Sequence, residues 1–219
     1  MQTIVTDCLV IGSGSAGSVY AHQASHAGLD VTLLSGRPDL SAGNSAYAQG
    51  GIVLEEVDAD LWDEIFAINV RGVILCTKHA VPLLKRSRGA VINMASVTGW
   101  RADPKQIGYS ASKHAVIGIT EACAQDLGRH GIRVNALCPG PVVTEALLSR
   151  IAKRVAGTSR TVEDSLAEDF APMIALGQVT TPEEVADGAL FLASDASRGV
   201  SALQLRIDGG NMSWPAKPE

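Results

Sequence analysis

TIVTDCLVIGSGSAG, residues 3–17, is the stretch that sets the fold class of this 219-residue chain. Residues 3–11 form an apolar run that predicts a buried strand, and a G-x-G-x-x-G turn follows it at once, at Gly12, Gly14 and Gly17. A helix of small residues then extends to about His26, and residues 31–34 predict a second strand. Such glycines let the backbone approach a pyrophosphate, which the helix N-terminus would face. The stretch therefore predicts a dinucleotide-binding unit.

Apolar runs bounded by turn residues continue this pattern along the chain. They predict strands over residues 90–96, 132–138 and 203–207. Helical stretches separate the strands, at residues 60–70, 107–129 and 182–194. Because strands alternate with helices, we expect an α/β fold: a three-layer, Rossmann-like domain around a mostly parallel, doubly wound sheet.

A tyrosine and a lysine four residues apart suggest a catalytic site. On a helix, Tyr109 and Lys113 would share one face. A phenol titrates near pH 10, so it exchanges protons at neutral pH only when a nearby cation favours the phenolate. Ser96 ends the predicted strand 90–96, and ligands of parallel sheets gather at the carboxyl ends of strands. Taken singly, each residue could equally be structural; together they favour a site.

From about Gly51 to Gly210 the chain resembles the short-chain dehydrogenase/reductase family. The residues that match its catalytic tetrad are Asn69, Ser96, Tyr109 and Lys113. The pair Pro139-Gly140 matches the turn beside the nicotinamide, and residues 207–210 (IDGG) match the C-terminal signature. The resemblance implies an NAD(P)-dependent oxidoreductase that interconverts an alcohol and a carbonyl by hydride transfer.

The resemblance also implies a role for each matching residue. Tyr109 would exchange a proton with the substrate oxygen, and Ser96 would hydrogen-bond that oxygen. Lys113 would hold the nicotinamide ribose and lower the pKa of the tyrosine. Asn69 would anchor a water of the proton relay, and Thr144 would contact the carboxamide. The family further implies a homodimer or homotetramer.

The first part of the chain departs from this family, whose T-G-x-x-x-G-x-G turn would need glycine at Ala16 and Ser18. Residues 1–52 resemble instead the FAD-binding start of L-aspartate oxidase, on the strings at residues 7–17 and 43–51. We therefore expect a single Rossmann-like domain over residues 1–219, built from a glycine-rich βαβ segment (1–52) and a catalytic segment (53–219).

Few residues before the boundary between these two segments are left to form the third strand region of the usual family fold. Only nine residues lie between Leu34 and Asn44, whereas a parallel crossover normally needs a dozen or more and a covering helix. We expect that region to be missing and one side of the sheet to be thinly covered.

The choice of cofactor depends on the end of the second predicted strand. A carboxylate there would bind a ribose diol and favour NAD, but the chain has Ser35 and Arg37. These two residues could bind a 2′-phosphate, which slightly favours NADP as the cofactor. Arg37 could equally be a solvated loop cation. NAD or NADP is therefore the expected cofactor, with FAD as a third possibility from the resemblance of residues 1–52.

Composition restricts the remaining classes of partner and location. A net charge of −5 and a pI near 5.5 argue against nucleic acid as a partner. The four cysteines and five histidines have no metal-ligand spacing, and no apolar stretch is long enough to cross a membrane. No signal peptide is recognised, so we expect a cytoplasmic protein acting on a small alcohol or carbonyl.

Two other functions stay open at this point. The chain could be a catalytically impaired hybrid that serves as a binding or oligomerisation module. It could also be a flavin-binding fragment similar to L-aspartate oxidase. Cofactor binding separates these possibilities, because each predicts a different result with NADH, NADPH and FAD.

Overall fold

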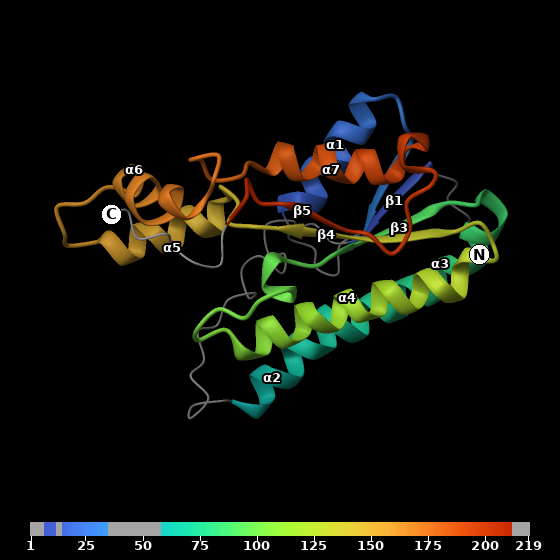
Figure 1. Ribbon diagram of the computed structural model, residues 1–219, viewed down its shortest axis with the longest axis horizontal. Helices are drawn as coiled ribbons and strands as arrows, with labels where there is room; N and C mark the ends of the chain where they lie inside the picture. The colour runs from blue at the N-terminus through green and yellow to red at the C-terminus, as the bar shows by residue number, and fades with distance from the viewer. Residues whose placement is uncertain (1–6, 12–14, 35–57, 212–219) are drawn as a thin grey trace.

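The computed structural model describes residues 7–11, 15–34 and 58–211, and its elements form three layers. The strands lie in the middle, as a two-stranded and a three-stranded sheet, with α1 and α7 on one side and α2, α3 and α4 on the other (Figure 1). The α5–α6 region extends beyond one end of the central strand β4 (Figure 1). The predicted three-layer α/β fold is confirmed.

All paired strands in these ranges run parallel. β1 (Cys8–Ile11) pairs with β2 (Val31–Leu34). The second set has the order β3-β4-β5, with bounds Ala90–Met94, Arg133–Pro139 and Gln204–Ile207. Because β4 is central, its carboxyl end meets those of both neighbours, through the register pairs Met94–Leu137 and Pro139–Ile207.

The helices follow the predicted pattern, and several begin at residues that cap them. Thr181 caps α7, whose Glu184 side chain accepts a hydrogen bond from the Thr181 backbone N–H in return. In chain order the α-helices are α1 (Ser15–His26), α2 (Ala59–Phe66), α3 (Gly72–Ser87), α4 (Ile107–Gly128), α5 (Glu145–Val155), α6 (Val162–Ser165) and α7 (Pro182–Ala193). Short π-helical or 3-10 turns are η3 (Ala67–Arg71), η4 (Val97–Gly99), η5 (Leu166–Phe170), η6 (Ala171–Met173) and η7 (Asp195–Ser197).

The core lies on both faces of β4, which explains its nearly unbroken apolar sequence. Ala136 and Cys138 pack with Val116 of α4, whereas Leu137 packs with residues of α7 on the other face. Asn135 is also fully buried, and its amide binds the backbone of Val200 and Leu203. That amide thus fixes the loop that leads into β5.

In the N-terminal unit, helix α1 contacts both strands, β1 and β2. Helix α1 packs against α7. Leu9, in the middle of β1, is nevertheless 41% exposed, as expected for a sheet side with little cover. The predicted loss of the third strand region concerns residues 35–57, which lie outside the described ranges.

Candidate active site

Ser96 lies two residues beyond β3, at the carboxyl edge of the sheet. It has an extended backbone and caps the η4 turn, where its hydroxyl accepts a hydrogen bond from the Thr98 N–H at 3.2 Å. The turn packs closely on α4: a Cβ added at Gly99 would come within 2.8 Å of the Lys113 carbonyl oxygen. Glycine is required for this approach, which brings Ser96 against the helix that carries Tyr109 and Lys113.

Helix α4 brings Tyr109 and Lys113 to the same side, as their spacing predicted. The Lys113 ammonium lies 5.6 Å from the centre of the Tyr109 ring. It donates a hydrogen bond of 2.9 Å to the carbonyl of Met94, the last residue of β3. The lysine thus joins α4 to the end of the neighbouring strand.

The surroundings of the Tyr109 phenol shift its pKa in opposite directions. Burial raises its pKa above the usual value near 10, whereas a hydrogen bond with Ser96 and the positive charge of Arg150 lower it. The net shift is upward. The effect that Lys113 is expected to have on this pKa stays a prediction; a cation that does lower it is Arg150, on α5.

Burial also acts on Lys113, because a charged ammonium is disfavoured away from water. It lowers the pKa of Lys113 from 10.5 to about 8, while the nearby Cys138 thiol opposes the change. The neutral amine is thus within reach near pH 8, which weakens the electrostatic support that this residue can give its neighbours.

Asn69 lies in a π-helical turn, η3, where helices α2 and α3 meet. Such turns often occur at functional sites because they break the regular backbone bonding. The Asn69 amide is buried and donates to the Ser112 hydroxyl at 3.1 Å, and Ser112 donates to the Tyr109 carbonyl at 2.7 Å. Asn69 is therefore connected to the backbone of Tyr109 through Ser112.

Pro139 and Gly140 leave β4 beside the end of β5. The Gly140 N–H donates to the Ile207 carbonyl at 3.0 Å, and a Cβ at this glycine would meet the Asp208 Cβ at 2.8 Å. Thr144 then caps α5, with its hydroxyl oxygen accepting from the Leu147 N–H at 3.2 Å. These residues lie on the same sheet edge as Ser96.

The other predicted cofactor residues belong to the N-terminal unit. Gly17 lies within α1. Gly12, Gly14, Ser35 and Arg37 lie outside the described residues, so their predicted roles stay predictions.

Two further residues, Ser112 and Arg150, were not predicted from the sequence as part of this site. Ser112 lies between Tyr109 and Lys113 in the sequence. Its position three residues after the tyrosine could have indicated a hydroxyl that binds the Tyr109 backbone carbonyl. Arg150 gives no such signal, because a basic residue within an amphipathic helix usually faces solvent. Only its position relative to Tyr109 distinguishes it.

The donors present fit the ribose and carboxamide of a nicotinamide dinucleotide. An ammonium has three hydrogen-bond donors. Lys113 donates one of them to the Met94 carbonyl, which leaves two for a pair of ribose hydroxyls. The Thr144 hydroxyl uses its oxygen as a cap and keeps its hydrogen to donate to an amide oxygen. No helix in the described ranges is long and apolar enough to pass through a membrane.

Known proteins share both the sequence and the fold of this chain. A family model described as enoyl-(acyl carrier protein) reductase matches residues 22–212. An uncharacterised oxidoreductase of Bacillus subtilis, YxbG, is 37% identical over 188 residues, covering 83% of this chain and 66% of that protein. Meso-2,3-butanediol dehydrogenase of Serratia marcescens is 34% identical over 184 residues, covering 84% and 68%. This chain thus spans about two thirds of the length of these relatives.

A solved structure extends the likeness to nearly the whole fold. The ligand-free aldohexose dehydrogenase of Thermoplasma acidophilum superposes with a TM-score of 0.81 at 24% identity, covering 97% of this chain and 96% of that one. No relative or structure supports the expected flavoprotein-like segment at residues 1–52, and the family match begins only at residue 22. The family match spans most of the sequence, and the chain therefore belongs to the short-chain dehydrogenase/reductase family of NAD(P)-dependent oxidoreductases.

Proposed function

We propose that this protein interconverts an alcohol and a carbonyl by hydride transfer, with Asn69, Ser96, Tyr109 and Lys113 as its site. The observation that carries the proposal is the meeting of three groups at one sheet edge: Ser96 lowers the pKa of Tyr109, and the Lys113 ammonium lies 5.6 Å from the centre of the Tyr109 ring while it binds the Met94 carbonyl at the end of β3. Two hydroxyl groups meeting there can bind one substrate oxygen between them. The ends of parallel strands are the usual place for such a ligand.

In the reducing direction, the carbonyl carbon would receive a hydride from a nicotinamide dinucleotide held at this edge. Ser96 orients the carbonyl by donating a hydrogen bond to its oxygen. Tyr109 then gives its phenolic proton to that oxygen as negative charge develops, which leaves a phenolate. The Ser96 bond and the Arg150 charge, which lower the Tyr109 pKa, stabilise that phenolate. Oxidation follows the same steps in reverse.

The other residues would hold the cofactor and return the proton. Lys113 would bind the ribose hydroxyls with its two remaining donors, and Thr144 would bind the carboxamide beside Pro139 and Gly140. Asn69 would hold a water that passes protons towards Tyr109. The turn with Gly12, Gly14 and Gly17 would take the pyrophosphate, and Ser35 with Arg37 would favour NADP over NAD.

The first experiment removes the proton donor. Tyr109→Phe should lower NAD(P)H-linked reduction of a panel of small ketones and diols by at least about 100-fold, as expected for loss of a general acid. Tyr20→Phe is the matched control, since it removes a half-buried phenol of α1 away from the site. Unchanged turnover in Tyr109→Phe, with far-ultraviolet circular dichroism unaltered, would refute the assignment.

Titration with NADH, NADPH and FAD, each added separately, tests the cofactor. We expect NADPH or NADH to bind and FAD not to bind. Tight FAD binding would favour the flavoprotein-like reading of residues 1–52. Failure of all three to bind would favour the catalytically impaired hybrid.

We further propose that the protein forms a homodimer or homotetramer through α3 and α4, which lie on the same face of the sheet (Figure 1). The outward side of α3 carries Leu75 and Leu83, which are 40% and 53% exposed. A small apolar surface of this kind on paired helices is suited to packing against its own copy.

A further inference from the structure

Strand β5 is followed at the carboxyl edge by a tight turn, residues 208–211, which we call the β5 turn. Gly209 and Gly210 both have positive φ angles, 60° and 77°, which glycine adopts without strain. The Asn211 N–H then donates to the Asp208 carbonyl at 3.0 Å and closes the turn. Asn211 is thereby held in the interior, with 4% of its surface exposed.

The side chain of Asn211 joins this turn to residues 96–101, which we call the Ser96 segment. Its Oδ1 accepts a hydrogen bond from the Arg101 guanidinium at 2.9 Å. Arg101 is bound back to the same segment, because its N–H donates to the Val97 carbonyl at 3.2 Å. The Gly99 N–H donates likewise to the Ser96 carbonyl at 3.0 Å. A shift of Arg101 would therefore be passed on to the backbone of Ser96.

Asn211 also meets two other segments at this edge of the sheet. It forms an antiparallel bridge with Ile174, directly after η6, and the neighbouring Gly210 carbonyl accepts from the Ala175 N–H at 3.3 Å. A Cβ added at Gly140, in the turn that leaves β4, would lie 3.7 Å from the Asn211 amide nitrogen. The Ser96 segment, the turn after β4 and the segment after η6 thus converge on one buried residue.

The β5 turn is already held by groups other than the Asn211 amide. The Asn211 carbonyl accepts from the Arg206 guanidinium at 3.2 Å, in addition to the bond that its N–H makes with Asp208. The Asp208 carboxylate binds Arg206 and the Gly210 N–H. The side-chain oxygen of Asn211 instead binds Arg101, a residue 110 positions earlier in the chain.

We propose that Asn211 is a positioning residue for the reaction. Through Arg101 it holds the Ser96 segment at the place where the Ser96 hydroxyl and Tyr109 can bind the same substrate oxygen. A displacement of about 1 Å from the reactive geometry can lower a rate about 100-fold, so a contact that fixes this segment affects turnover without touching substrate. This inference rests on the proposed function.

The experiment compares two side chains at position 211. Asn211→Leu has a similar volume but no acceptor for Arg101, whereas Asn211→Asp keeps an oxygen there. Arg101→Gln removes the donor, together with the ion pair that Arg101 makes with Asp103 at 3.9 Å. Arg133→Gln is the matched control at the opposite end of β4, where the guanidinium donates to the Ser197 hydroxyl at 2.8 Å. We measure kcat and KM for ketone reduction, and stability in urea.

We expect kcat to fall about tenfold or more in Asn211→Leu and in Arg101→Gln, with KM for the ketone changed less than about threefold. The double variant should be no slower than the slower single variant, because both changes break the same contact. Asn211→Asp should keep most of the wild-type kcat, since a carboxylate also accepts from a guanidinium. Arg133→Gln should lose stability and keep the wild-type kcat.

Three results would overturn the inference. They are an unchanged kcat in Asn211→Leu, a kcat in Asn211→Asp as low as in Asn211→Leu, and a kcat loss in Arg133→Gln equal to that in Arg101→Gln. If Asn211→Leu does not fold, Arg101→Gln decides against Arg133→Gln, because the Arg101 side chain is 25% exposed and tolerates a polar replacement.

Absence of turnover in the wild type would count against the proposed function instead, and hydrogen exchange then decides about the contact. The Thr98 N–H donates to the Ser96 hydroxyl at 3.2 Å and so reports on that hydroxyl directly. Amides of residues 98–101 should exchange faster in Asn211→Leu than in Asn211→Asp or Arg133→Gln. Equal exchange in the three variants overturns the inference.

Discussion

Tyr109 and Lys113 lie in an environment that disfavours charge on both. Burial raises the pKa of the phenol and lowers that of the ammonium, so the neutral forms are favoured in each case. A neutral phenol is the form that gives a proton to a developing alkoxide, and this suits the reducing direction. The Ser96 hydrogen bond and the Arg150 charge limit the upward shift and keep the phenolate accessible.

The first prediction concerns the pH dependence of stability. Because the pKa of Lys113 is about 8 in the folded protein and near 10.5 when exposed, the unfolded chain binds more protons between these values. Stability should rise with pH across this window, and below pH 8 the full cost of burying the ammonium applies. Lys113→Met should remove this contribution, which is at most about 3 kcal/mol. Urea unfolding of both proteins from pH 7 to 10.5 measures it.

The second prediction separates catalysis from packing by comparing two similar hydrogen-bonded groups on α4. Asn69 donates to Ser112, which donates to a backbone carbonyl; Asn93 donates to Thr120 at 3.0 Å, and Thr120 donates to the Val116 carbonyl. Ser112→Ala and Thr120→Val each leave a buried side-chain amide without its hydrogen-bond acceptor. Both should lose about 1–3 kcal/mol of stability in urea unfolding.

Only the first substitution should affect turnover. Ser112 connects Asn69 to Tyr109, so kcat should fall in Ser112→Ala with little change in KM, while Thr120→Val keeps the wild-type kcat. Equal kcat losses in the two variants would show that Ser112 matters only for packing.

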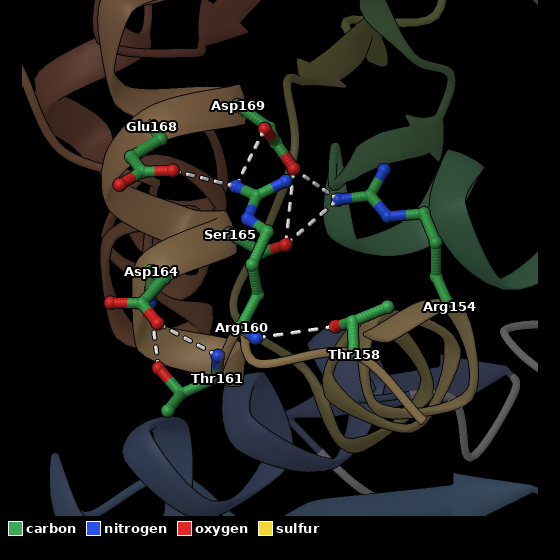
Figure 2. Close-up of polar contacts among 8 residues, drawn as sticks. All are labelled: Arg154, Thr158, Arg160, Thr161, Asp164, Ser165, Glu168 and Asp169. Carbon is green, nitrogen blue, oxygen red and sulfur yellow. Dashed lines mark hydrogen bonds and ion pairs between the residues drawn. The ribbon is translucent and has the colours of Figure 1, made fainter. Parts of the chain in front are cut away.

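At the scale of elements, a polar cluster around Asp169 holds together the segment from α5 to η5. Asp169 accepts from Arg154 in the last turn of α5 and from Arg160 in the loop between α5 and α6, which ties that loop to η5 (Figure 2). The Arg160 hydrogen bond is the main reason why the pKa of Asp169 is lowered. A depressed carboxyl pKa means that this contribution is present at neutral pH and lost as pH falls through the folded value.

The third prediction is that Asp169→Asn loosens this segment. Hydrogen exchange of residues 145–170 should become faster, and KM for substrate should rise more than kcat falls. Glu163→Gln is the charge-matched control, since Glu163 is an exposed residue of α6 outside the cluster. Exchange that stays as slow in Asp169→Asn as in the control would contradict the prediction.

At the scale of the whole molecule, the two faces of the sheet differ in their outer surfaces. α1 and α7 cover one face, and the paired helices α3 and α4 cover the other with exposed apolar side chains (Figure 1). A dimer through the second face would leave the carboxyl edge, with Ser96, open to substrate.

The fourth prediction tests this arrangement. Leu83→Glu puts a charge on the outward side of α3 and should shift the protein from dimer or tetramer to a smaller species in light scattering after size exclusion. Leu29→Glu, at a residue of similar exposure after α1, is the control and should leave the mass unchanged. A monomeric wild type would refute the proposed oligomer.

Sequence reasoning was most successful where local patterns carry the information. Strands were recognised as apolar runs, and α7 as a helix because Thr181, Pro182 and Glu184 form a helix start that needs no distant partner. The spacing of Tyr109 and Lys113 correctly predicted a shared helix side. The upward shift of the Tyr109 pKa and the downward shift of the Lys113 pKa were not predicted, because a pKa depends on burial and on charges from other elements.

The strands, the helices α1, α2, α4 and α7 and the identity of the proposed site residues were readable from the chain, whereas α3 and α5 were not predicted. The readable features follow from periodicity and side-chain chemistry, which act over a few residues. The pairing of Arg154 with Asp169, the link from Asn69 through Ser112 and the effect of Arg150 on the Tyr109 pKa were not readable. Each depends on packing between segments distant in sequence, and only folding sets those distances.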